Sequence, residues 1–189
     1  MYHIKDDLRA EKSAELLYEA LKRCMEEKEF DKIAISDLSK VSTVSRATFY
    51  RNFDGVIDIL YWKCDCLFRE VLTAYVSSDP NLSQPDGLIN YVFGFWMQHT
   101  DILEILIDRG RMDIIYNSFL NNAGVVMEYL SAKLHIPDWN NCYFLATRVG
   151  VFVGMFQAWF AGGKQESAEE LIRIMNQQAI AVKDSGLIF

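Results

Sequence analysis

The stretch that decides the fold is AISDLSKVSTVSRATFYRNF, residues 34–53. Two short helical patterns, residues 36–42 and 46–52, are separated by three residues, which allows only a tight turn. The apolar positions of both patterns fall on faces that can meet between two steeply crossed helices: Leu38, Val41, Val44, Phe49 and Phe53. The spacing therefore predicts a helix-turn-helix.

The second of these helices has the features of a base-reading helix. Ser45 is a good N-cap, so the helix is expected to begin at Arg46 and to present Arg46, Ala47 and Thr48 outward in its first turn. A helix in the major groove reads base edges with such N-terminal residues. The planar fork of Arg46 matches two acceptors on guanine, and Tyr50, Arg51 and Asn52 are expected to reach the phosphate backbone.

The run VSRATFYRNF, residues 44–53, ends a predicted three-helix unit at the start of the chain and resembles the tetracycline-repressor (TetR) family. The resemblance covers about a quarter of the chain. It implies a homodimer with an N-terminal DNA-binding domain and a larger helical domain that senses a small molecule. It also implies that Arg46 and Ala47 face bases and that Thr48, Tyr50 and Asn52 face phosphates. The candidate DNA-binding residues are Ser36, Lys40, Thr43, Ser45, Arg46, Ala47, Thr48, Tyr50, Arg51 and Asn52.

Three positions depart from the family's pattern. Thr43 stands where the family usually has glycine in the turn, and a β-branched residue disfavours a left-handed backbone, so an adjusted turn is expected. Ala34 stands where a threonine would cap the first helix of the motif, with Ser36 as a substitute cap. Gly55 and Val56 fall where a lysine often begins the following helix, which removes one expected phosphate contact.

Composition predicts a folded, all-α protein. Hydrophobic residues make up 51 per cent of the 189 residues, and glycine and proline together number only 13. The net charge is −7, of which residues 1–55 carry −1 and residues 56–189 carry −6. This division matches the predicted domains, a helix-turn-helix domain over residues 1–55 and an effector-binding and dimerisation domain over residues 56–189. Within residues 34–53, Lys40, Arg46 and Arg51 outnumber Asp37, as phosphate binding requires.

The helical patterns predict six further helices, at residues 8–28, 56–77, 88–98, 102–108, 114–135 and 139–161, and a final one at 167–182. Turn residues separate them at 79–81 and 84–87, Pro137 ends one helix, Asp138 caps the next, and Gly162-Gly163 closes it. Residues 141–161 are apolar enough to raise the question of a membrane span. Arg148 and Gln157 interrupt that segment, so a buried core helix is the favoured interpretation and no membrane partner is expected.

The last two helices are the predicted dimer interface. Gly150-x-x-x-Gly154 permits close helix approach, and the apolar face around it is wide for one partner. The alternative is that both helices are core of the monomer. The interface candidates are Gly150, Val153, Gly154, Phe160, Leu171 and Met175.

The middle of the chain is rich in aromatic and methionine side chains, which line many pockets for apolar ligands. At these spacings the same residues also fit an ordinary core. The effector-binding candidates are Phe93, Trp96, Met97, His99, Phe119, Met127, Tyr143, Arg148, Met155 and Trp159, with Asn117 and Asn122 as further polar candidates.

The sequence predicts no enzyme, cofactor or metal site. Glu104 and Asp108 lie four apart on one helix, as solvent-exposed acids often do, and no phosphate loop, nucleophile elbow or metal-ligand spacing is present. With no signal peptide at the start, a cytoplasmic protein with reduced, structural cysteines is expected.

The predicted function is a DNA-binding repressor that a small-molecule effector releases from a palindromic operator. Two alternatives remain open. One is a ligand-binding or protein-interaction module with a vestigial helix-turn-helix, and the other is an activator or co-regulator that needs a partner.

Overall fold

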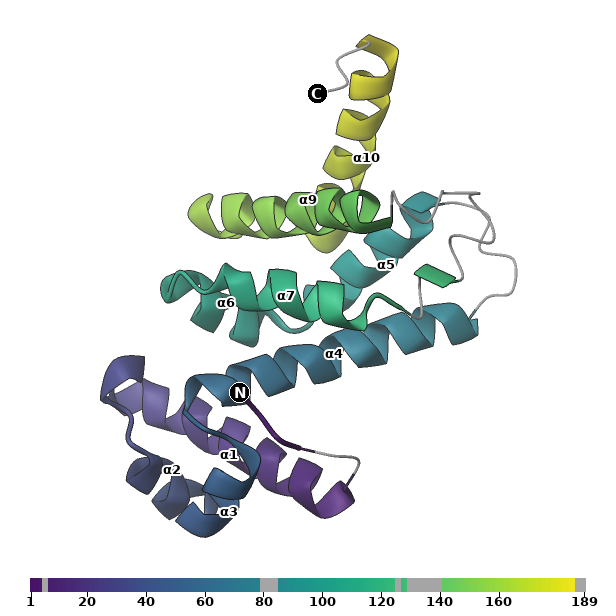
Figure 1. The fold of residues 1–189 in the computed structure, drawn as a ribbon. Coiled ribbons are helices and arrows are strands. Elements are labelled where there is room, and N and C mark those ends of the chain that lie inside the picture. The colour runs from purple at the N-terminus through teal and green to yellow at the C-terminus, as the bar shows by residue number, and fades with distance from the viewer. Residues whose placement is uncertain (5–6, 79–84, 125–126, 129–140, 186–189) are drawn as a thin grey trace. The chain divides into compact units, whose positions relative to one another are not determined.

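A computed structural model of the chain describes residues 1–4, 7–78, 85–124, 127–128 and 141–185 (Figure 1). Over these residues the protein is all-α, with nine α-helices, one 3-10 helix and an isolated antiparallel bridge between Tyr2 and Phe53. The elements are α1 (Leu8–Glu27), η1 (Phe30–Lys32), α2 (Ile35–Ser42), α3 (Arg46–Asn52), α4 (Ile57–Ser78), α5 (Pro85–Trp96), α6 (Thr100–Asp108), α7 (Met112–Asn122), α9 (Asn141–Ala161) and α10 (Ala168–Ser185).

The helices form two compact units, Met1–Leu67 and Phe68–Phe189. The division falls within α4, so the first unit includes the first half of that helix. The sequence places its domain boundary earlier, after residue 55, and that functional division stays a prediction.

In the N-terminal unit, α1 packs against α2 and α3 around a small apolar core (Figure 1). Leu38, Phe49 and Phe53 are fully buried and Val44 is nearly so, as the helix-turn-helix pattern predicts. The inward prediction for Val41 is wrong, because its side chain is 39% exposed. The inward position one turn after Leu38 belongs instead to Ser42, whose hydroxyl donates to the Leu38 carbonyl at 2.6 Å.

In the C-terminal unit, α9 packs against α5, α6 and α7, and α10 packs against α5 (Figure 1). Its core is a cluster of aromatic rings in mutual contact. Phe68 lies 4.6 Å from Trp96 and 5.4 Å from Phe119, measured between ring centroids. Phe93 stacks on Phe156 at 4.4 Å with an interplanar angle of 15°. Tilted and edge-to-face contacts of this kind fill a core without leaving a large void.

The predicted helix over residues 114–135 is not continuous. Helix α7 ends at Asn122, and Ala123 forms a turn. The Asn122 side chain donates to the Ser118 carbonyl at 2.8 Å, and such local bonding competes with the helical ladder. Helical structure resumes at Gly124, and Met127 and Glu128 are also helical, so among the described residues the interruption is at Ala123. Residues 129–135, together with Pro137, Asp138, Trp139 and the predicted turn at 79–81, lie outside the described residues. The predicted turn at 84–87 is wrong for residues 85–87, which belong to α5.

Other helix ends agree closely with the sequence. Helix α5 begins at Pro85, earlier than the predicted residue 88, because proline is compatible with the first turn of a helix. Helix α9 ends before Gly163, which takes a positive φ of 83°. The amide of Lys164 then bonds the Trp159 carbonyl at 2.9 Å, which closes the helix end.

Candidate functional site

The turn between α2 and α3 keeps the tight geometry of the motif despite having no glycine. Thr43 adopts a left-handed backbone with φ of 62°, so the expectation of an adjusted turn is wrong. The turn is held from inside by Ser42, whose buried hydroxyl oxygen accepts the Val44 N–H at 3.1 Å. The strain at Thr43 is therefore offset by local hydrogen bonds and by the burial of Val44.

Helix α2 begins without a side-chain cap at Ala34. Ser36 is not the substitute cap that the sequence predicts, because it lies inside the helix. Asp37 takes that role from within the first turn, where its carboxylate accepts the Ala34 N–H at 3.1 Å and pairs with Lys28 at 2.9 Å. The Lys28 ammonium, followed by the Ala34 N–H, lowers the pKa of Asp37 below its ordinary value.

Helix α3 presents one polar face to solvent and one aromatic face to the core. The Ser45 hydroxyl accepts the Thr48 N–H at 3.1 Å, which confirms the predicted cap. Ser45, Arg46, Ala47 and Arg51 are exposed and Thr48 is half-buried. Tyr50 is 59% exposed, whereas Phe49 is fully buried. The first turn of this helix is thus available to an external partner.

Asn52 does not belong to that exposed surface. Only 4% of the residue is exposed, and its Nδ2 has no hydrogen-bond partner among the described residues. It lies three positions after Phe49, and residues at that spacing share one helix face. A phosphate contact from its side chain is therefore excluded, and this part of the site prediction is wrong.

The remaining candidates lie on or beside α2. Lys40 and Thr43 are exposed, and Ser36 is half-buried. At the start of α4, the Asp58 carboxylate accepts the N–H groups of Asp54 at 3.1 Å and of Gly55 at 2.9 Å. These two amides are therefore bonded within the protein, and the expected loss of a phosphate contact at Gly55 and Val56 stays a prediction.

Half of the ten predicted effector-binding residues are packed core. Phe93 and Trp96 are fully buried, and Phe119, Met127 and Trp159 are at most 7% exposed. Tyr143 is instead 69% exposed. Met97, His99, Arg148 and Met155 are half-buried; His99 stacks against Phe95 at 4.6 Å, and Arg148 lies over the Phe144 ring at 5.0 Å.

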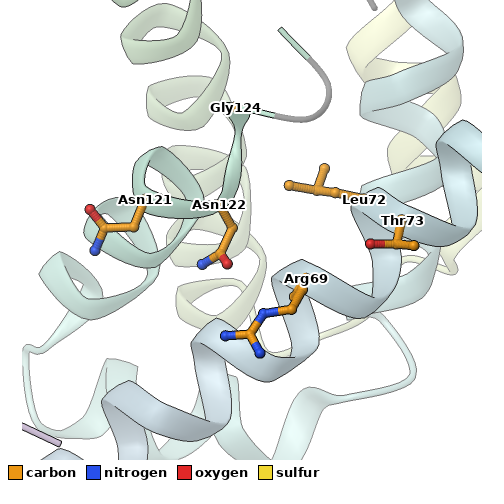
Figure 2. Close-up of a pocket in the computed structure, with 6 residues that line it drawn as sticks. All are labelled: Arg69, Leu72, Thr73, Asn121, Asn122 and Gly124. Atoms are coloured by element: carbon orange, nitrogen blue, oxygen red, sulfur yellow. The ribbon is translucent and has the colours of Figure 1, made fainter. Parts of the chain in front are cut away.

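The C-terminal unit contains a cavity of about 260 Å³ between α4 and the end of α7. None of the ten effector-binding candidates lines it, but the further polar candidate Asn122 does. Figure 2 shows the Arg69 guanidinium and the Asn122 amide extending into the space between these helices. The complete lining is Arg69, Leu72, Thr73, Asn121, Asn122 and Gly124. Periodicity did not single out Arg69 or Thr73, because an exposed polar residue on a helix is ordinary.

One face of α9 is apolar and uncovered. Between Tyr143 and Ala161 the helix is long and apolar enough to cross a membrane, by length and composition alone, and 22% of its most apolar window is buried. The expected buried core helix is therefore wrong for much of this segment. Gly150 and Gly154 are exposed, and a Cβ at either would meet no atom within 4 Å. The exposed stripe comprises Tyr143, Thr147, Gly150, Val151, Gly154, Gln157, Ala158 and Ala161.

The other interface candidates divide between surface and core. Val153 and Phe160 are half-buried. Leu171 is 4% exposed and Met175 is 7% exposed, so both are buried within the chain itself. They face inward because α10 packs on α5, and their predicted place in an interface is wrong.

The two acidic residues that lie four apart on α6 are at the surface, as the sequence analysis favours. Glu104 and Asp108 are both exposed, and Glu104 pairs with Lys164 at 3.2 Å. Exposed carboxylates have no enclosed space in which to act as a catalytic pair.

Comparison with known proteins supports the fold. No protein-family model matches the sequence, and no curated protein matches it. Among solved structures, the chain is similar to Lin0861 from Listeria innocua, with a TM-score of 0.69 and 18% sequence identity. The match covers 95% of this chain and 96% of that chain. The protein thus shares its all-helical fold with Lin0861, and at this identity the likeness concerns the fold alone.

Proposed function

We propose that the chain is a DNA-binding transcriptional regulator of the TetR type, and specifically a repressor that a small-molecule effector releases from its operator. The observation that carries this proposal is α3. Its first turn exposes Arg46 and Ala47 while Phe49 anchors the opposite face in the core. An arginine so placed has the geometry for bidentate bonding to guanine O6 and N7.

In this proposal residues 1–55 read DNA and residues 56–189 bind the effector and the second subunit. Two α3 helices of a homodimer enter successive major grooves about 34–36 Å apart, on a palindromic site. Lys40, Tyr50 and Arg51 are the exposed residues nearest the reading turn that suit phosphate contacts. An effector that favours a conformation with another separation releases the DNA.

The uncovered face of α9 supports the dimer. The stripe exposes Tyr143 and Val151 to water, and small residues such as Gly150 and Gly154 allow a second helix to approach closely. A second copy of the same helix fits this stripe about a two-fold axis. With Leu171 and Met175 assigned to the core, α9 carries the main interface in this proposal.

The test is selection of bound sequences from a random duplex pool at low salt, using the purified full chain. We expect enrichment of a palindrome bound with a dissociation constant on the order of 10⁻⁸ to 10⁻¹¹ M and with strong salt dependence. Arg46→Ala should cost roughly 1–3 kcal/mol and relax the preference at one base pair of each half-site. Arg23→Ala, an exposed arginine on α1, is the matched control and should leave the selected sequence unchanged.

Two outcomes would overturn the proposal. Recovery of no enriched sequence would favour a ligand-binding or protein-interaction module, for which the net charge of −7 is the specific supporting observation. An unchanged base preference in the Arg46→Ala selection would remove Arg46 from the reading position.

A further inference from the structure

We propose that the cavity between α4 and α7 binds a small ligand that carries an oxyanion, either a carboxylate or a phosphate monoester. That this ligand is the effector rests on the proposed DNA-binding function, whereas the binding itself does not. The cavity belongs wholly to the C-terminal unit and is lined by residues of two helices and the turn that follows α7.

The charge of the lining residues indicates that the ligand is an anion. Arg69 is the charged residue among the six that line the cavity, and no carboxylate lies among them. No described residue forms a hydrogen bond or ion pair with Arg69, so its guanidinium is available to an external anion. A guanidinium presents a planar fork of donors that matches the two oxygens of a carboxylate or phosphate.

The polar groups beside Arg69 indicate which other chemical groups the ligand carries. Asn122 from α7 and Thr73 from α4 supply an amide and a hydroxyl group near Arg69, whereas the Asn121 amide points away from it (Figure 2). The Asn122 Nδ2 is held by the Ser118 carbonyl at 2.8 Å, so this side chain is fixed before a ligand arrives. Such groups suit a hydroxyl or amide on the ligand beside its anionic end, and buried Leu72 offers a small apolar contact.

The cavity volume limits how much of the ligand it covers. At about 260 Å³ it is slightly smaller than the usual range of ligand pockets. Since one water occupies about 30 Å³ of liquid, the space holds roughly ten non-hydrogen atoms. The cavity is open to solvent, since Arg69, Thr73 and Asn121 are exposed, so this number describes the part of a ligand that it covers. The aromatic side chains that the sequence suggests for an apolar effector fill the core and do not line the cavity.

The position of Arg69 gives the ligand a route to the DNA-binding unit. Arg69 and Thr73 lie on α4, and the same helix forms part of the N-terminal unit up to Leu67. A ligand that bridges α4 and α7 therefore contacts a helix shared by both units. If binding alters DNA affinity, DNA must alter ligand affinity by the same factor.

The experiment uses thermal unfolding and calorimetry of the full chain with millimolar benzoate, lactate or glycerol 3-phosphate. The uncharged counterparts benzamide, lactamide and glycerol are measured in parallel at equal ionic strength. We expect at least one anion to raise the Tm by about 4 °C or more near saturation, with no shift from its uncharged counterpart. If benzoate or lactate raises the Tm and glycerol 3-phosphate does not, the ligand is a carboxylate. If only glycerol 3-phosphate raises the Tm, the ligand is a phosphate monoester.

Variants tie the binding to this cavity. Arg69→Gln keeps a polar side chain at an exposed helical position and should weaken binding of the active anion by about tenfold or more. Thr73→Val, which removes the hydroxyl on the α4 side, should weaken it as well. Arg173→Gln, at an exposed arginine of α10 in the same unit, should bind as the wild type does. Circular dichroism without ligand confirms that each variant is folded.

The inference is overturned if no anion in the panel shifts the Tm, if charged and uncharged members shift it equally, or if Arg69→Gln retains full binding. Because these measurements contain no DNA, they separate the two proposals. Anion binding through Arg69 together with a failed duplex selection would keep the cavity assignment and refute the repressor. A successful selection without anion binding would do the opposite.

Discussion

Thr43 shows that the turn of the helix-turn-helix can form without the glycine that is usual there. Its φ of 62° lies in the left-handed region, where a β-branched side chain is strained. Thr43→Gly should therefore raise the free energy of unfolding by about 0.5–1 kcal/mol, after allowing for the greater freedom of glycine in the unfolded chain. Urea unfolding measures the change.

A matched control for that substitution is Thr48→Gly, within the right-handed α3 helix, which should lower stability instead. If Thr43→Gly lowers the stability of the protein as Thr48→Gly does, the backbone of Thr43 is not strained.

Asn52 provides a second test at the scale of one residue. Its buried Nδ2 lacks a partner among the described residues, and such a group costs about 1–3 kcal/mol. Asn52→Leu should therefore fold with at least wild-type stability and bind the selected duplex with unchanged affinity.

The neighbouring substitution Arg51→Leu, on the exposed face of the same helix, should weaken binding to all sequences. Loss of DNA affinity in Asn52→Leu, equal to that in Arg51→Leu, would contradict the assignment of Asn52 to the core.

The short helices of the motif also show which side-chain positions the sequence alone does not predict. Helices α2 and α3 have only eight and seven residues, so periodicity separates their faces poorly. The cap at Ser45 and the anchor at Phe49 are local features and were predicted correctly. The inward position of Asn52 and the outward position of Val41 depend on packing against other helices, which local patterns do not contain.

At the scale of the element, α2 depends on an ion pair across to the end of α1. The pKa of Asp37 is lowered in the folded state, chiefly by the Lys28 hydrogen bond, so the pair stabilises the protein above the unfolded pKa near 3.8. This contribution disappears as the pH falls through the lower, folded pKa. Asp37→Asn, which keeps an acceptor for the Ala34 N–H, should therefore be less stable than wild type at pH 7.

The stability of Asp37→Asn relative to wild type should depend on pH, and the comparison at acid pH tests this. Urea unfolding of Asp37→Asn and wild type should give a stability difference that shrinks below pH 4, as the wild-type carboxylate becomes protonated. Asp31→Asn, on η1, controls for loss of a negative charge alone. An equal difference at pH 3 and pH 7 would show that the charge on Asp37 contributes nothing.

Most helices could be placed from the sequence because their caps and breakers are local. Ser45 and Gly163 act where predicted, whereas Pro85 begins α5 instead of lying in the predicted turn. The break at Ala123 was missed because it arises from the Asn122 side chain bonding its own helix, an option that the apolar pattern does not record. The cavity was missed for a related reason, since its lining comes from two helices about fifty residues apart.

At the scale of the whole molecule, the uncovered face of α9 predicts a dimer. Light scattering at micromolar concentration should give twice the 21.8 kDa chain mass. Gly154→Arg places a charged side chain on the exposed stripe, where a Cβ meets no atom of its own chain, and should give the monomer mass with the helix intact.

Asn117→Arg, at an exposed position of α7, is the control and should remain dimeric. A wild-type monomer, or a Gly154→Arg dimer, would show that another surface or another partner covers α9.

The central claim is that Arg46 lies on the edge of a base pair, and a double-mutant cycle between protein and DNA tests it most directly. Wild type and Arg46→Ala are each titrated with the selected duplex and with the same duplex carrying 7-deazaguanine at the affected position. We expect the Arg46→Ala substitution and the 7-deazaguanine substitution each to weaken binding alone. The two together should weaken it little more than either one, which corresponds to a coupling energy of about 1 kcal/mol or more. Fully additive losses would contradict it.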